Sequence, residues 1–161
     1  MALGDNTLRS AAGNSQRGRN PYMVQTTLNW ATALSDKGGA LAAADVVPVI
    51  AVPKGTMILN AGIEVDTATD GSTFTVDLGT GVDPDVFVDG FDATSAAAVV
   101  AQNPAVYQPV MAVADDNIDV TIATLSGGAV TSGKFRVWAV LMDCTDMGDT
   151  AANEVARDAL A

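Results

Sequence analysis

The 161-residue sequence contains no histidine and only one cysteine, Cys144. Without histidine, neither a Ser-His-Asp triad nor a Cys-His dyad can form, and one thiol provides neither a multi-cysteine zinc site nor an intrachain disulfide. Cys144 has no histidine to act as its base, so we interpret it as a small packing side chain rather than a nucleophile. These absences predict a protein that is not an enzyme and needs no cofactor.

Basic residues are also scarce. Eight lysines and arginines oppose nineteen acidic residues, and the net charge is −11. A surface of this charge repels phosphate backbones and anionic lipids, so we expect neither nucleic acid nor a membrane as a partner. No apolar run reaches the ~20 residues of a membrane-spanning helix, and the first residues lack the pattern of a secretory signal.

The acidic residues are nearly all aspartates, with Glu64 and Glu154 as the two glutamates, and there are 15 glycines. Aspartate and glycine favour turns and strand ends, whereas the glutamate and lysine that fill exposed helix faces are few. Hydrophobic residues make up 48% of the chain, and its length suits one domain with a core of its own. The composition favours an all-β fold.

Alternation of apolar and polar residues predicts where the strands lie. The odd-numbered residues from Met57 to Val65 are all apolar, and the pattern resumes after Asp70-Gly71. Two alternating segments around Asp-Gly are typical of a β-hairpin. About seven or eight strands are expected, with Pro48 at an edge or a bulge; the other segments are 22–30, 45–52, 74–78, 109–113, 118–124 and 134–142, while 96–101 is a short helix or a covering loop.

The expected architecture is an antiparallel β-sandwich flanked by two simpler segments. Residues 1–21 are small and polar, and Arg9, Arg17 and Arg19 oppose Asp5 alone, which gives this arm a charge of +2 and the rest of the chain −13. We predict an extended N-terminal arm at 1–21, a sandwich domain at 22–144, and a C-terminal tail at 145–161 with a short helix.

One stretch of the sandwich carries a pattern shared with other proteins. It runs through Pro-x-Gly-Thr, an alternating strand, Thr-Ala, a turn, a second alternating strand, Gly-x-Gly-x-Asp and an aromatic residue. The matching segments, between about residues 45 and 143, are Val52–Ala68, Ser72–Phe87, Val106-Tyr107, Asp116–Thr121 and Gly133–Val137. The pattern resembles small virion proteins of tailed bacteriophages, especially those of marine and cyanobacterial hosts.

This resemblance implies a jelly-roll-like sandwich that serves as a capsid decoration, or cement, subunit on the exterior of the phage head. It also implies synthesis in the host bacterial cytoplasm, contacts with the major capsid protein, and self-association, with a homotrimer expected by analogy. The alternative is a tail or fibre module that binds host-surface glycan, because tail proteins reuse similar sandwiches and fold alone does not define function.

Two sets of residues are candidates for binding. Asp83, Asp85 and Asp89, with Asp92 nearby, supply oxygen ligands of the type that calcium needs, but no glutamate closes the loop and turn formation is the favoured interpretation. The second set would form an interface with other subunits and combines basic and aromatic side chains; its members are Arg9, Arg17, Arg19, Tyr22 and Trp138.

Overall fold

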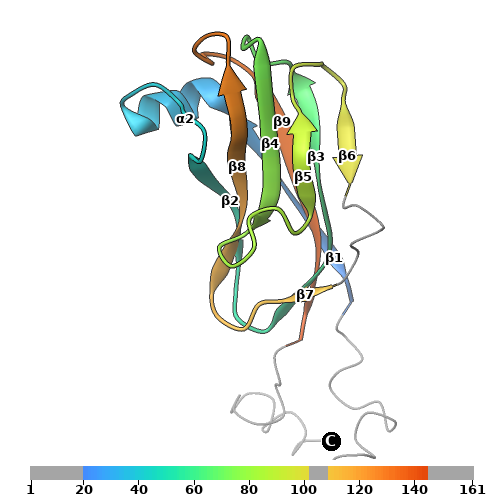
Figure 1. Ribbon diagram of the computed structural model, residues 1–161. Helices are drawn as coiled ribbons and strands as arrows, with labels where there is room; N and C mark the ends of the chain where they lie inside the picture. Colours follow the sequence, from blue (N-terminus) through green and yellow to red (C-terminus); the bar gives the residue numbers. More distant parts are fainter. Residues whose placement is uncertain (1–19, 102–108, 145–161) are drawn as a thin grey trace, which may run out of the picture.

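The computed structural model describes residues 20–101 and 109–144, which form two antiparallel sheets packed face to face (Figure 1). In the first sheet the order is β1 (Tyr22–Asn29), β9 (Lys134–Asp143), β3 (Thr56–Thr67) and β6 (Val99–Ala101), and β7 (Val110–Met111) also pairs with β3. In the second sheet the order is β2 (Val46–Val52), β8 (Asp116–Ser126), β4 (Thr73–Thr80) and β5 (Val88–Asp92). The expected antiparallel sandwich is confirmed.

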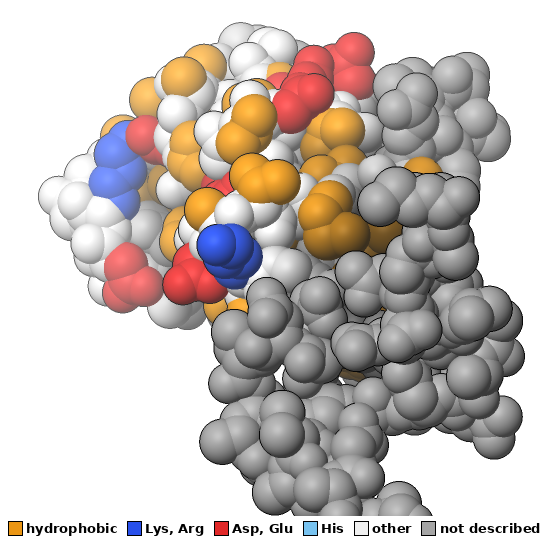
Figure 2. All heavy atoms as spheres, turned by 90° about the horizontal axis from the view of Figure 1, so that it is seen from below, with side chains coloured by type: hydrophobic (Ala, Val, Ile, Leu, Met, Phe, Trp, Pro, Cys, Tyr) orange, Lys and Arg blue, Asp and Glu red, His pale blue; other side chains and the backbone are white. Residues whose placement is uncertain are grey.

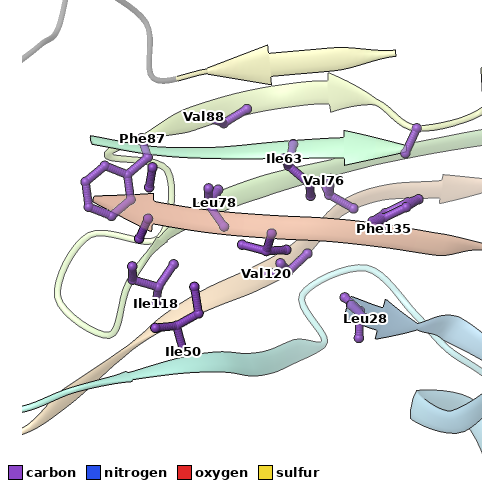
Figure 3. Close-up of a cluster of buried hydrophobic side chains, with 14 of the residues drawn as sticks. Leu28, Ile50, Ile63, Val76, Leu78, Phe87, Val88, Ile118, Val120 and Phe135 are labelled. Atoms are coloured by element: carbon purple, nitrogen blue, oxygen red, sulfur yellow. The ribbon is translucent and has the colours of Figure 1, made fainter. Parts of the chain in front are cut away.

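The core lies between the inner faces of the two sheets, where alternate residues of the long strands point toward one another (Figure 3). Each of these strands places every second side chain inside, as its period of two requires. The alternation expected for β4, β8 and β9 is confirmed by their buried residues, which are Phe74, Val76, Leu78, Ile118, Val120, Ile122, Phe135, Val137, Ala139 and Leu141.

Three aromatic rings join the sheets near one end of the core. Phe74 comes from the second sheet, Phe135 from the first, and Trp30 from the segment that follows β1. The Trp30 ring meets Phe74 and Phe135 edge-on, with ring centroids 5.0 and 5.4 Å apart. Edge-to-face contacts of this kind add about 0.5–1.5 kcal/mol each to the burial of the rings themselves. The cluster therefore ties the chain between β1 and β2 to both sheets.

The expectation that β3 buries its odd-numbered residues throughout is wrong in the first part of the strand. Thr56 and Ile58 are buried, whereas Met57 and Leu59 are half-buried. The register with β9 shifts between Ile58 and Asn60, which is a β-bulge. The extra residue at a bulge exchanges the two faces of the strand, so the odd-numbered pattern holds only from Ala61 onward.

The expected hairpin around Asp70-Gly71 is also wrong. β3 belongs to the first sheet and β4 to the second, so the chain crosses between sheets at this point. The Asp70 carboxylate accepts hydrogen bonds from the backbone N–H groups of Thr131 (2.8 Å) and Ser132 (3.1 Å), and from the Thr131 hydroxyl. Asp70 thus anchors the crossover to the β8–β9 loop instead of closing a tight turn.

Two local elements differ from expectation. Trp30, expected as the last residue of the strand at 22–30, instead begins helix α2 (Trp30–Lys37), which Asn29 caps and which ends at Gly38. Residues 96–101, expected as a helix or covering loop, include strand β6.

Pro48 lies on edge strand β2 beside a register shift, which confirms the expectation of an edge or a bulge at this residue. The expected C-terminal helix falls within 145–161, outside the described residues.

The Asp70 anchor makes a testable contribution to stability at low pH. Its hydrogen bonds, first from the Thr131 hydroxyl and then from the Thr131 backbone, lower the pKa of Asp70 from 3.8 to about 2. A carboxyl with a lowered folded-state pKa stabilises the fold above about pH 4 and loses that contribution as the pH falls toward 2. We expect Asp70→Asn to lower the urea midpoint at pH 6 and to flatten its decline between about pH 4 and 2.

Urea unfolding followed by circular dichroism across this pH range measures both effects. Asp36→Asn, which changes an exposed carboxylate on α2, is the matched control and should leave the slope as in the unmodified chain. An Asp70→Asn slope identical to that of the control would contradict the anchor.

Candidate interaction surfaces

The four aspartates considered for calcium lie along the β4–β5 connection and β5 but do not converge on one point. Asp92 accepts hydrogen bonds from the Thr94 hydroxyl (2.7 Å) and backbone N–H (2.9 Å), which lower the pKa of its carboxyl. A hydrogen bond shared with Asp85 raises the pKa of Asp83. Within residues 20–101 and 109–144, no group of three or more histidine, cysteine or acidic side chains is arranged to hold a metal ion.

The loop that carries Asp83 and Asp85 folds back against β4. A Cβ added to Gly79 would overlap the backbone of Asp83 and Pro84, so only glycine permits this close approach. The loop is tied down by hydrogen bonds from the Thr80 N–H to the Asp83 carbonyl (2.8 Å) and from the Phe87 N–H to the Leu78 carbonyl (3.0 Å). Gly79 therefore allows the loop to pack against β4.

The structure describes two of the five predicted interface residues, Tyr22 and Trp138, and they lie on opposite faces of the first sheet. Trp138 lies on the outer face of β9, and Tyr22, 45% exposed, pairs in register with the buried Leu141 and so belongs to the inner face at the start of β1. Arg9, Arg17 and Arg19 lie outside the described residues. The shared interface of the five residues stays a prediction.

Trp138 is half-buried because its ring lies over Gly62 on the neighbouring strand β3. Beside it on the same face, the Arg136 guanidinium donates to the Glu64 carboxylate at 3.0 Å. The ring therefore lies against its own sheet, and the neighbouring cation is already paired. Binding of a glycan through Trp138 would need an open aromatic ring face. This arrangement leaves little of the Trp138 ring open.

A groove at one end of the sandwich was not found by sequence reasoning. It encloses about 600 Å³ between the β4–β5 loop and the chain from β7 into β8. Three of its lining side chains are large, apolar and exposed, namely Val82 (86%), Val113 (77%) and Met111 (41%). Figure 2 looks onto this end and shows hydrophobic side chains gathered beside acidic ones.

The rim of the groove is acidic. Asp83, Asp115 and Asp116 line it, and no lysine or arginine side chain does so among the described residues. Asp115 accepts from the Lys54 backbone N–H (2.9 Å), and Asp116 from that of Asn117 (2.8 Å), so both carboxylates are held in position. Burial, and secondarily the Asp116 charge, raises the pKa of nearby Asp119. The groove thus combines an apolar floor with crowded negative charge.

Sequence reasoning missed the groove because its lining comes from four separate segments. The ends of β2 and β3 contribute Val52 and Ile58, and the other lining residues lie in 80–86 and 110–117. The available signal was weak: Val82 and Val113 are apolar residues in loop segments rich in aspartate and glycine. The fold brings these segments to the same end.

Comparison with known proteins finds similarity in structure only. No family model and no curated protein matches the sequence. The fold is similar to a chain of the cyanophage Pam1 capsid asymmetric unit, with a TM-score of 0.59 and 15% identity over 78% of this chain and 86% of that one. It is also similar to a chain of the capsid of Ralstonia phage GP4, with a TM-score of 0.56 and 16% identity over 79% and 86%.

These similarities establish a shared fold. Separately, none of the helices within 20–101 and 109–144 has the length and hydropathy needed to cross a bilayer.

The contact between Trp138 and Gly62 can be tested by adding one methyl group. A Cβ at Gly62 would overlap the Trp138 ring and lie 2.8 Å from the Val100 carbonyl oxygen. We expect Gly62→Ala to lower the free energy of unfolding by about 1–3 kcal/mol, the usual cost of overpacking. Urea denaturation measures this loss.

Gly39→Ala is the matched control, because nothing lies within 4 Å of a Cβ there, and its effect should stay within about 0.5 kcal/mol. Adding Trp138→Ala to Gly62→Ala should cost less than the sum of the two single changes. Full additivity would contradict the contact.

Proposed function

We propose that this chain is a capsid decoration, or cement, subunit that binds the outer surface of a tailed phage head and stabilises the shell through contacts between subunits. The observation that carries the proposal is the fold similarity to chains of two phage capsids, which extends over most of each chain. The motif pattern of residues 45–143 independently resembles phage decoration proteins. In this function the protein supplies shape and adhesion, and no catalysis.

The order of the strands supports a jelly-roll description. With the two-residue β7 set aside, eight strands form two four-stranded sheets, and the chain passes from sheet to sheet at each step except β4 to β5. A jelly roll has eight strands in two sheets and is a common architecture of viral capsid proteins. The fold is therefore suited to a stiff virion part, although the same architecture serves other functions.

Charge supports a position on the outside of the head. The chain carries a net charge of −11, and a strongly acidic protein is repelled by the phosphates of packaged DNA. Its partners in this proposal are the major capsid protein and further copies of itself, with a homotrimer as the expected assembly. Synthesis takes place in the host bacterial cytoplasm, before attachment to the head.

The proposed mechanism is burial of surface between subunits. The N-terminal arm, residues 1–21, would reach at most ~70 Å when extended. An arm that orders on docking adds on the order of 1,000 Å² to the contact of a rigid body. Its three arginines suit acidic and carbonyl partners, because guanidinium groups donate several hydrogen bonds at once.

Electron cryomicroscopy of the intact particle that carries this chain tests the proposed location. We expect density for the sandwich on the exterior of the head, in contact with the major capsid protein. Density confined to the tail or its fibres would favour the glycan-binding alternative and overturn the decoration proposal.

Removal of residues 1–21 tests the contribution of the arm. Because the arm supplies part of the buried area, we expect the truncated chain to occupy fewer sites on heads at equal concentration, as measured by quantitative gel analysis of purified particles. The matched control exchanges the arm for a glycine-serine segment of equal length, and it should show the same loss. Unchanged occupancy would exclude the arm from the mechanism.

A further inference from the structure

The groove at the end of the sandwich has the properties of a docking site for an extended peptide. Val82 and Val113 are among the most exposed large hydrophobic residues in the described structure, and both line the same hollow as Met111. Exposed apolar surface that is concentrated and bordered by polar residues marks an interaction site. The groove therefore needs an occupant with apolar side chains.

The acidic rim restricts what the occupant can be. Asp83, Asp115 and Asp116 border the groove, so a partner that brings acidic groups would be repelled and one that brings arginines would be attracted. In this chain, the segment that combines leucines with an excess of arginine is the N-terminal arm. It contains Leu3, Leu8, Arg9, Arg17 and Arg19 against the single acid Asp5.

Strand β1, which follows the arm in the sequence, starts near the same end of the molecule as the groove. Tyr22 and Ile58 flank Leu141 in register, so the first residue of β1 lies two strands from a residue that lines the groove. Figure 1 shows the start of β1 and strand β7 toward the same end of the sandwich. The 14 peptide steps from Leu8 to Tyr22 span up to ~45 Å when extended, which is enough to reach an adjacent molecule.

We propose that the groove binds the N-terminal arm of a second copy of this chain, with the leucines against Val82 and Val113 and the arginines against the acidic rim. Charge favours this pairing between copies. The chain without its arm carries −13, so two bodies repel each other, whereas the arm carries +2 and is attracted to the body of a neighbour. The inference deepens the proposed function by naming the partner that links decoration subunits.

The arm and the groove are different parts of the chain, so the proposed contact joins unlike parts of two copies, as in a head-to-tail interface. Such contacts join copies into a closed ring when the rotation between them closes. A ring of three would agree with the homotrimer expected above. Each subunit then both donates an arm and receives one.

Site-specific photocrosslinking in the full-length chain tests the proposal. The photoreactive residue benzoylphenylalanine replaces Val82 in one copy, which also carries Thr7→Ser and Ser10→Thr as mass markers in its tryptic arm peptides. This copy is co-expressed with an unmarked chain, the mixture is irradiated, and crosslinked peptides are identified by mass spectrometry. We expect position 82 to be joined to unmarked peptides from residues 1–19.

Matched variants test the apolar contact. Val113→Asp, introduced into both copies, should reduce the crosslinked product several-fold because it replaces an apolar lining side chain and puts a charge against the leucines. Val46→Asp is the control, because Val46 is also exposed (55%) but lies six residues along β2 from Val52 at the groove. It should leave the yield unchanged.

Each other outcome overturns the inference. Crosslinks to marked arm peptides alone mean that the arm folds onto its own body, and crosslinks to residues 102–108, 145–161 or the sandwich mean another occupant. Absence of any crosslink, or equal loss in Val46→Asp and Val113→Asp, likewise removes the arm from the groove. Since the test needs no virus particle, it can fail while the chain still binds phage heads, and the two proposals remain separable.

Discussion

Burial of the two inner sheet faces against each other is the constraint on which the rest of the structure depends. Trp30, Phe74 and Phe135 join both sheets and the β1–β2 connection in one cluster. Removing a buried aromatic ring from such a cluster costs about 3–5 kcal/mol, a large part of the 5–15 kcal/mol that stabilises a typical domain. With the inner faces committed to the core, the loops, outer faces and ends are what the protein can offer to partners.

The outer surfaces show two consequences of that commitment. On the first sheet, Trp138 lies over Gly62, so an aromatic residue that sequence parity places outside is nevertheless half-buried. On the second sheet, the β4–β5 loop folds back over Gly79 and carries Val82 and Asp83 to the end of the sandwich. The groove there depends on local backbone packing that only glycine permits, and the adjacent aspartates make its rim negatively charged.

The sequence was a better guide to the body of the fold than to its surfaces. Period-two alternation in β4, β8 and β9 identified their buried faces because burial of one face is a local property of each strand. The candidate calcium ligands, such as Asp83 and Asp85, are neighbours in the sequence. The groove instead joins Val52, Ile58 and two later segments, and nothing in local spacing reveals that the fold brings them together.

By itself the sequence determined that the fold is mostly β with antiparallel strands, that the chain is acidic and that histidine chemistry is absent, since these follow from composition and short-range periodicity. Tertiary structure decided the rest. The bulge between Ile58 and Asn60 exchanges the faces of β3, and Asp70 bonds to Thr131 across 61 residues so that the chain crosses to the other sheet. Alternation specifies that one face of a strand is buried, but which sheet buries it is set by long-range pairing.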